Sequence, residues 1–435
     1  MKTLKLARRN VFRNPRRSLA TACAAALSAA GILLFGGFTA SIQKMLETAI
    51  VRASGHIHIY KAGYFEFGEA NPAGHSIEKY DDLVKLLRET PELKGKIRII
   101  TKVQEVYGIA SNFRTDSSKI FSGLGVVPSE YTALGGWNPY KITIYKTEDS
   151  PGVSDTDLNS GIIGTGMARI LGLCKALGVD GCPEKPLPQK TENKKPKTDF
   201  SYLMDGAEDP APADPRPRID LIAATAQGAP NVVDLYVNKA LPIGIKTQDD
   251  SFIAMHIDKA QTLLYGRSEK KISGLIIQLE KTSQLAQAEK TIKKLLAENR
   301  PDLITLNYTT LQPAYGQAAA MLDTIFAFIA LIMGMIVLFT VINTMSTSVV
   351  ERTSEIGTLR ALGLRRSNVI RMFVSEGLIL GVAGATAGVL LAFSTAAAIN
   401  ALGFTWTPPT FARPVVFSVH ILLNPALAPV CWCGI

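Results

Sequence analysis

Three long stretches without charged side chains divide this chain of 435 residues. They cover residues 18–43, 324–350 and 377–412. Each is longer than the roughly 20 apolar residues that a helix needs to cross a lipid bilayer. The pattern therefore predicts transmembrane helices at 18–43, 318–350 and 372–399.

A long stretch between the first two spans, residues 44–317, mixes strand and helix periods. Two of its parts, 76–125 and 272–307, each combine a helix with strands, and we expect them to come together in space. Residues 183–218 are rich in Pro, Lys, Glu and Asp, which predicts a flexible loop. The whole stretch is predicted to be a mixed α+β domain.

The same periods predict the elements of this domain. Helices are expected after Ser76 and after Thr282 or Ser283, because hydroxyl side chains cap helix N-termini. The segment Gly161–Leu173 is expected to run from a strand through glycines into a helix, with a spacing unlike that of the dinucleotide fingerprint. Strands are expected at 54–60, 97–101, 104–110, 117–124, 219–225, 232–240 and 272–279.

Basic residues set the expected orientation of the chain in the membrane. The net charge is +10, and residues 1–17 carry several Lys and Arg but no acidic residue. A second basic cluster lies at 351–371, between the second and third spans. Because basic segments stay in the cytoplasm, both clusters are predicted to be cytoplasmic and the α+β domain to lie outside. Residues 1–17 are expected to form an amphipathic helix at the membrane surface.

The end of the chain has a less regular pattern. Residues 400–435 are predicted to form an outer loop followed by a fourth transmembrane helix that is cut short. Asn424, Pro425 and Pro429 interrupt the apolar residues there, and no Lys or Arg follows Arg413. The alternative is that 415–435 is a complete but poor span.

The segment between the second and third spans predicts a short amphipathic helix. Apolar residues recur every three positions, charged residues fill the other positions, and a glycine stands where a helix would end. We expect this helix to dock against a cytoplasmic partner, and the alternative is an ordinary positive membrane flank. The residues expected to take part are Arg352, Glu355, Ile356, Leu359, Arg360, Leu362 and Gly363.

Small residues and cysteines suggest further contacts. Gly377, Gly381, Gly384 and Gly388 recur every three or four positions in the third span, which predicts close helix packing in lipid. Cys174 and Cys182 stand just before the loop at 183–218. In an oxidising compartment they can form a disulfide, and two free thiols are the alternative.

Several kinds of chemistry lack a sequence signal. The chain has no Walker A loop, no His-Glu-x-x-His motif, no Cys-x-x-Cys zinc pattern and no Gly-x-Ser-x-Gly elbow. His56 and His58 could supply half of a metal site, but no third ligand stands nearby. No nucleic-acid recognition motif accompanies the basic residues. We therefore predict no catalytic, cofactor or metal site, and no nucleic-acid binding.

Four segments together resemble the FtsX-like permease family of ABC systems, and within it the MacB and lipoprotein-releasing branch. They are Leu6–Arg17 before the first span, Ser54–Ile59 after it, the glycine-rich Gly161–Leu173, and Arg352–Gly363 after the second span. The last segment is the most specific, because Glu-Ile-Gly is followed by Arg-Ala-Leu-Gly between two spans.

This resemblance implies a non-enzymatic membrane subunit with four spans in the bacterial inner membrane. ATP and magnesium would be bound by a separate cytoplasmic ABC ATPase, and a second permease copy or paralogue would complete the transporter. The substrate would be a lipoprotein or an amphiphile, handled among membrane lipids with a periplasmic adaptor or chaperone. The alternative is a transmembrane signalling or scaffold protein that regulates a periplasmic cell-wall hydrolase.

Overall fold

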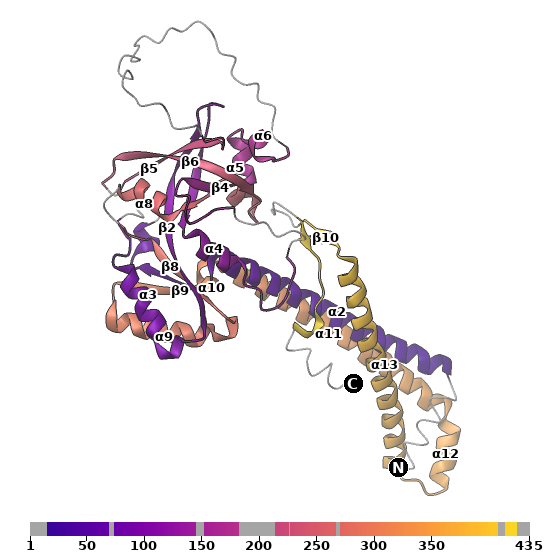
Figure 1. The fold of residues 1–435 in the computed structure, drawn as a ribbon. Coiled ribbons are helices and arrows are strands. Elements are labelled where there is room, and N and C mark those ends of the chain that lie inside the picture. The colour runs from indigo at the N-terminus through magenta and orange to yellow at the C-terminus, as the bar shows by residue number, and fades with distance from the viewer. Residues whose placement is uncertain are drawn as a thin grey trace, which may run out of the picture.

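The computed structural model describes residues 15–68, 74–144, 152–181, 214–225, 227–266, 270–407 and 414–423. Three long helices form an elongated bundle, and a domain built around a large sheet stands at one end of it (Figure 1). The predicted helix at 1–17 and most of the loop at 183–218 lie outside the described residues.

The three long helices contain the predicted spans. They are α2 (Pro15–Ser54), α11 (Pro313–Glu351) and α13 (Arg366–Leu402), and each is long and apolar enough to cross a membrane. Each helix extends beyond the predicted span, because a helix can continue outside the lipid where its polar side chains and backbone are hydrogen-bonded. Residues 424–435 lie outside the described residues, so a fourth span remains a prediction.

Helix α2 packs along both of the other long helices. Gly384 and Gly388 of α13 lie directly on it: a Cβ at Gly384 would stand 2.7 Å from Cβ of Ala25, and one at Gly388 would stand 2.5 Å from the carbonyl oxygen of Ala26. Both distances are shorter than van der Waals contact. Gly377 lies near Met345 of α11, whereas Gly381 has no described atom within 4 Å of a Cβ position.

The domain is built on nine strands in the order β3-β7-β4-β6-β5-β2-β8-β1-β9, with a further pairing of β3 with β2. Because β2 pairs with both β3 and β5, six strands close into a ring, and its pairs are mostly antiparallel with two parallel ones. The strands are β1 (Ile57–Lys61), β2 (Ile97–Asn112), β3 (Ser117–Val126), β4 (Ser160–Gly164), β5 (Arg218–Ala224), β6 (Pro230–Leu241), β7 (Phe252–His256), β8 (Gly274–Leu279) and β9 (Leu303–Asn307).

Two apolar cores fill the domain. One lies within the ring of strands, where Phe121, Leu221 and Leu235 meet Leu263 of a covering helix. The other lies between the β2-β8-β1-β9 part of the sheet and two helices. The shorter helices of the domain are α3 (Tyr80–Glu89), α4 (Pro128–Gly135), α5 (Thr165–Ile170), α6 (Cys174–Leu177), α7 (Lys246–Asp249), α8 (Ile257–Tyr265), α9 (Leu285–Asn299) and α10 (Tyr308–Leu311).

Shorter elements complete the description. Outside the domain, α12 (Thr353–Ala361) connects α11 to α13, and β10 (Thr405–Trp406) pairs with β11 (Val415–Val416). The described residues also include one π-helical turn at Tyr64–Gly68 and three 3₁₀ turns at Pro91–Leu93, Thr282–Gln284 and Ile421–Leu423.

The structure confirms that residues 76–125 and 272–307 come together, because β2 pairs with β8 in antiparallel register. The predicted strands at 97–101 and 104–110 are one long strand. The two predicted helix caps were wrong. The hydroxyl of Ser76 contacts that of Tyr265, and the helix begins later, at Tyr80. Thr282 instead begins a 3₁₀ turn, and its hydroxyl contacts Glu47 of α2.

Candidate functional site

Helix α12 stands at the end of the bundle farthest from the sheet domain (Figure 1). A glycine-ended cap terminates it: the N–H of Gly363 donates to the carbonyl of Arg360 at 3.0 Å, and that of Leu364 donates to Leu359 at 3.1 Å. Gly363 has φ +92°, a left-handed conformation that favours glycine. This cap reverses the chain, so that α13 starts only a few residues later.

A buried ion pair lies beneath α12. Nη1 of Arg352, at the junction of α11 and α12, is 3.5 Å from Oε2 of Glu376 in α13. The two residues are only 8% and 4% exposed. An unpaired charge at such a depth is costly, whereas a paired one is tolerated. The pair therefore fixes the start of α12 against α13.

The predicted apolar ridge is divided between two surfaces. Ile356 packs towards Val369, Met372 and Phe373 of α13, so it belongs to the interior of this corner. Leu362, in contrast, is 80% exposed. The ridge splits because α12 ends at Ala361, one residue before Leu362, and the cap turns the chain there.

The outward surface of α12 is thus smaller than predicted. We define the docking surface as Glu355, Arg360 and Leu362, all of which are exposed, with the half-buried Leu359 beside them. Arg352 does not belong to it, because its guanidinium is buried against Glu376. Sequence reasoning missed Glu376 altogether. Its signal was a single carboxylate at the start of a long apolar run, where an unpaired charge is unfavourable.

The domain carries two buried histidines at its attachment to α2. Burial lowers the pKa of His56 to about 4, although the carboxylate of Glu47 acts in the opposite direction. Burial also lowers the pKa of His58 to about 4, against a smaller opposing effect of the Ser54 backbone. Both side chains are therefore neutral near pH 7. Among the described residues no three His, Cys, Asp or Glu side chains are grouped as a metal site would require.

Cys174 begins α6 and its sulfur is disulfide-bonded. Cys182 lies outside the described residues, so its pairing with Cys174 remains a prediction.

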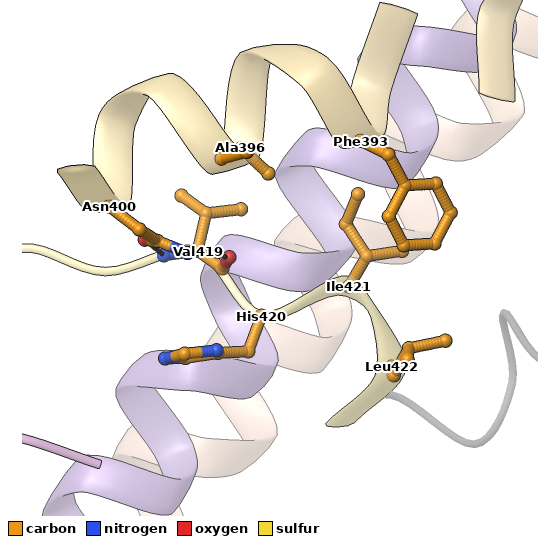
Figure 2. Close-up of a pocket in the computed structure, with 8 residues that line it drawn as sticks. Phe393, Ala396, Asn400, Val419, His420, Ile421 and Leu422 are labelled. Carbon is orange, nitrogen blue, oxygen red and sulfur yellow. Dashed lines mark hydrogen bonds between the residues drawn. The ribbon is translucent and has the colours of Figure 1, made fainter. Parts of the chain in front are cut away.

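A small cavity of about 230 Å³ lies at the other end of α13. Figure 2 shows Phe393 and Ala396 of α13 facing Ile421 across it. The side-chain amide of Asn400 closes one end, donating to the carbonyl of Val419 at 2.9 Å and accepting from its N–H at 2.8 Å. The lining is mostly apolar and carries no grouping of charged side chains, so we assign it no chemistry.

A comparison with known families decides the assignment. Residues 327–431 match the family model described as the FtsX-like permease C-terminal domain. The chain therefore carries an FtsX-like permease domain in this region. The matched region of this permease contains most of α11, all of α12 and the whole of α13, and therefore the docking surface and the ion pair beneath it.

The names of similar curated proteins combine a permease with an ATP-binding function. This permease is 27% identical over 213 residues to the macrolide export ATP-binding/permease protein MacB of Sodalis glossinidius, covering 47% of this chain and 33% of that protein. It is 28% identical over 195 residues to MacB of Vibrio parahaemolyticus, and the match covers 42% of this chain and 29% of that protein. The chain thus spans about a third of the length of these curated relatives.

Two solved structures resemble part of this permease. They are the extracellular domain of the noncanonic ABC-type transporter YknZ, at 16% identity and a TM-score of 0.31, and the periplasmic region of MacB from Actinobacillus actinomycetemcomitans, at 11% and 0.33. The YknZ match covers 58% of this chain and 100% of the YknZ domain. The MacB match covers 61% of this chain and 94% of the MacB region. These TM-scores are too low to add to the assignment.

Proposed function

We propose that this permease is the membrane subunit of an ABC transporter and that a separate cytoplasmic ATPase binds the docking surface of α12. The position of α12 carries the proposal: it stands at the end of the bundle farthest from the sheet domain (Figure 1), and it directly follows α11, whose other end leads into that domain. Movement forced on α12 would reach the domain through α11 and, through the packing of α13, along α2.

The orientation follows from the basic residues that flank the spans. Arg360 lies in the docking surface, and Arg365 and Arg366 follow it closely in sequence. Basic residues here support a cytoplasmic α12, and therefore a sheet domain on the periplasmic side of the inner membrane. The chain itself would be non-catalytic, and ATP with magnesium would be bound by the partner. A second permease, identical or paralogous, would supply the other half of the transporter.

The large domain outside the membrane supports a bulky or amphiphilic substrate. A nine-stranded domain of this size is far larger than anchoring would require. We propose that the transporter moves or releases a lipoprotein or another amphiphile at the outer surface of the inner membrane, in some systems with a periplasmic adaptor or chaperone.

Affinity purification of the tagged chain in mild detergent tests this function. Recovery of an ABC ATPase in stoichiometric amount, together with a lipoprotein or an adaptor, is the expected result. The matched control is the Leu362→Glu variant, which should insert normally but recover less ATPase. Recovery of a cell-wall hydrolase without any ABC ATPase would contradict transport and would favour a signalling or scaffold role.

A further inference from the structure

The outer end of α2 enters the sheet domain and is held there by hydrogen bonds. Val51 is fully buried, and its carbonyl accepts from Nε2 of Gln278 in β8 at 3.0 Å. The same amide nitrogen donates to the carbonyl of Leu134 in α4 at 2.9 Å. One side chain of the sheet thus binds the backbone of α2 and that of α4.

A carboxylate makes a second attachment about one turn earlier in α2. Glu47 is 2% exposed, and its Oε1 accepts from the hydroxyl of Tyr140 at 2.7 Å and from that of Thr282 at 2.5 Å. Its Oε2 lies 2.7 Å from Nζ of Lys44. Hydrogen bonds to an ionised, buried group are stronger and more directional than those between neutral groups. Glu47 therefore joins α2 to two segments that are distant in sequence.

His56 gives this network a fixed direction. Its Nδ1 accepts from the backbone N–H of Leu279 at 3.0 Å, so the proton of the neutral ring is on Nε2. Nε2 lies 3.1 Å from Oγ1 of Thr282 and donates to it. The Thr282 hydroxyl in turn donates to Glu47, which completes an ordered chain from β8 through His56 to α2.

The second long helix begins at the same place. The backbone N–H of Tyr308, at the start of α10, donates to the carbonyl of His56 at 3.0 Å, and α11 follows α10 directly. The ring of His56 also meets Trp137 edge to face, with centroids 5.0 Å apart. Both long helices thus meet the domain at His56.

We propose that this joint, formed by Glu47, His56, Tyr140, Gln278 and Thr282, makes α2 and the sheet domain one rigid lever, with Glu47 as its positioning residue. A role of this lever in transport rests on the proposed function, whereas the rigidity of the joint does not depend on it. Twenty residues separate Leu27 from Glu47, which is about 30 Å of helix. A tilt of about 10° at the joint would therefore displace Leu27 by ~5 Å.

Distances between two spin labels test the rigidity. One label replaces Leu27, which is 65% exposed on α2, and the other replaces Lys294 on the outer surface of α9, with the unpaired native cysteines replaced. The test variant is Thr282→Val with Tyr140→Phe, which removes both hydroxyls from Glu47 and keeps the shapes of the side chains. The matched control is Thr291→Val with Tyr107→Phe, whose hydroxyls donate to the carbonyl of Gln287 in α9 and to the carboxylate of Glu105 in β2.

The full chain in lipid nanodiscs should give a narrow distance distribution, and the control should match it. The test variant should give a distribution that is broader or displaced by ~5 Å. The Thr282→Val single variant, which preserves the Tyr140 contact, should give a smaller change and serves if the double variant does not fold. An unchanged distribution in a folded test variant would overturn the proposal.

A second measurement separates this inference from the proposed function. With the partner ATPase bound, the test variant should retain ATPase binding and hydrolysis but lose most substrate release. If the wild-type chain binds no ATPase while the test variant still broadens the distances, the transport function fails and the joint stands. If release is normal and the distances are unchanged, the joint has no such role.

Discussion

Arg352 and Glu376 form a buried pair across the corner where α11, α12 and α13 meet, with Nη1 and Oε2 3.5 Å apart. The two residues are 24 positions apart in sequence, and Arg352 stands immediately before α12, which carries the docking surface. The pair links the segment that carries the docking surface to α13, which packs along α2. The orientation of α12 therefore depends on a contact that is not itself exposed.

Breaking this pair on one side should destabilise the chain. Arg352→Met removes the buried guanidinium beside the Glu376 carboxylate, and breaking a buried ion pair on one side costs about 3–5 kcal/mol. Thermal unfolding in detergent should show a lower midpoint for Arg352→Met and for Glu376→Leu. The double variant should lose less than the sum of the two. Arg371→Met, at an exposed position of α13, is the control and should change little. Strict additivity of the two single variants would contradict a coupled pair.

Glycine substitutions in α13 should have effects that depend on their position. Gly388→Ala places a Cβ 2.5 Å from the carbonyl oxygen of Ala26, so α2 and α13 must move apart, at a cost of about 1–3 kcal/mol. Gly381→Ala meets no described atom within 4 Å and should be neutral or slightly stabilising. Unfolding midpoints of the two variants check this. Equal midpoints would show that the helices do not pack as described.

The buried histidines should make the domain sensitive to acid. The pKa values of His56 and His58 are about 4 in the folded chain, against 6.5 ordinarily. Between these values the unfolded chain binds more protons than the folded one, so the stability that these groups contribute is present above pH 6.5 and is lost as the pH falls towards 4. The difference corresponds to about 3 kcal/mol for each histidine. Unfolding followed by tryptophan fluorescence at several pH values, with Trp406 and Trp432 replaced by Phe so that Trp137 alone reports, measures this difference.

The His58→Phe variant isolates one of these contributions. It keeps an aromatic ring against Tyr60 but cannot titrate. Between pH 6.5 and 4 its unfolding should therefore take up one proton fewer than that of the wild type, which gives a shallower slope of unfolding free energy against pH. An unchanged slope would mean that His58 is not buried neutral in the folded chain.

Charge reversal on the docking surface should separate ATP hydrolysis from transport. Glu355→Arg or Arg360→Glu changes an exposed side chain, so insertion and unfolding midpoint should stay close to those of the wild type. Substrate release by the reconstituted transporter should fall several-fold. Reversal at the exposed Lys294 of the sheet domain is the control. Normal release by both docking-surface variants would exclude this role for α12.

Local patterns were sufficient to predict much of the fold. Long uncharged runs located the three long helices, because only apolar residues are stable in lipid over that length. The strand at β4 and the following helix were expected from Gly161–Leu173. The ends of the long helices could not be predicted in this way. Helix α2, for example, continues to Ser54 through contacts of Glu47 and Arg52 that form only in the folded chain.

The site could be predicted only in part, for a similar reason. Periodicity placed Ile356, Leu359 and Leu362 on one face, but the cap at Gly363 turns Leu362 outward and α13 covers Ile356. No local pattern pairs Arg352 with Glu376, since that contact depends on how α13 returns beside α11. The closed ring of six strands likewise depends on long-range pairing of β2 with both β3 and β5.

Photo-crosslinking from position 362 in living cells reports which molecule contacts the docking surface. Leu362 is 80% exposed at the end of α12, and a crosslinker there reaches only what touches the docking surface. The same crosslinker at Lys294 of the sheet domain is the control. Position 362 should capture an ABC ATPase, and position 294 should not. Capture of lipid alone at position 362, with no ATPase, would contradict the proposed docking.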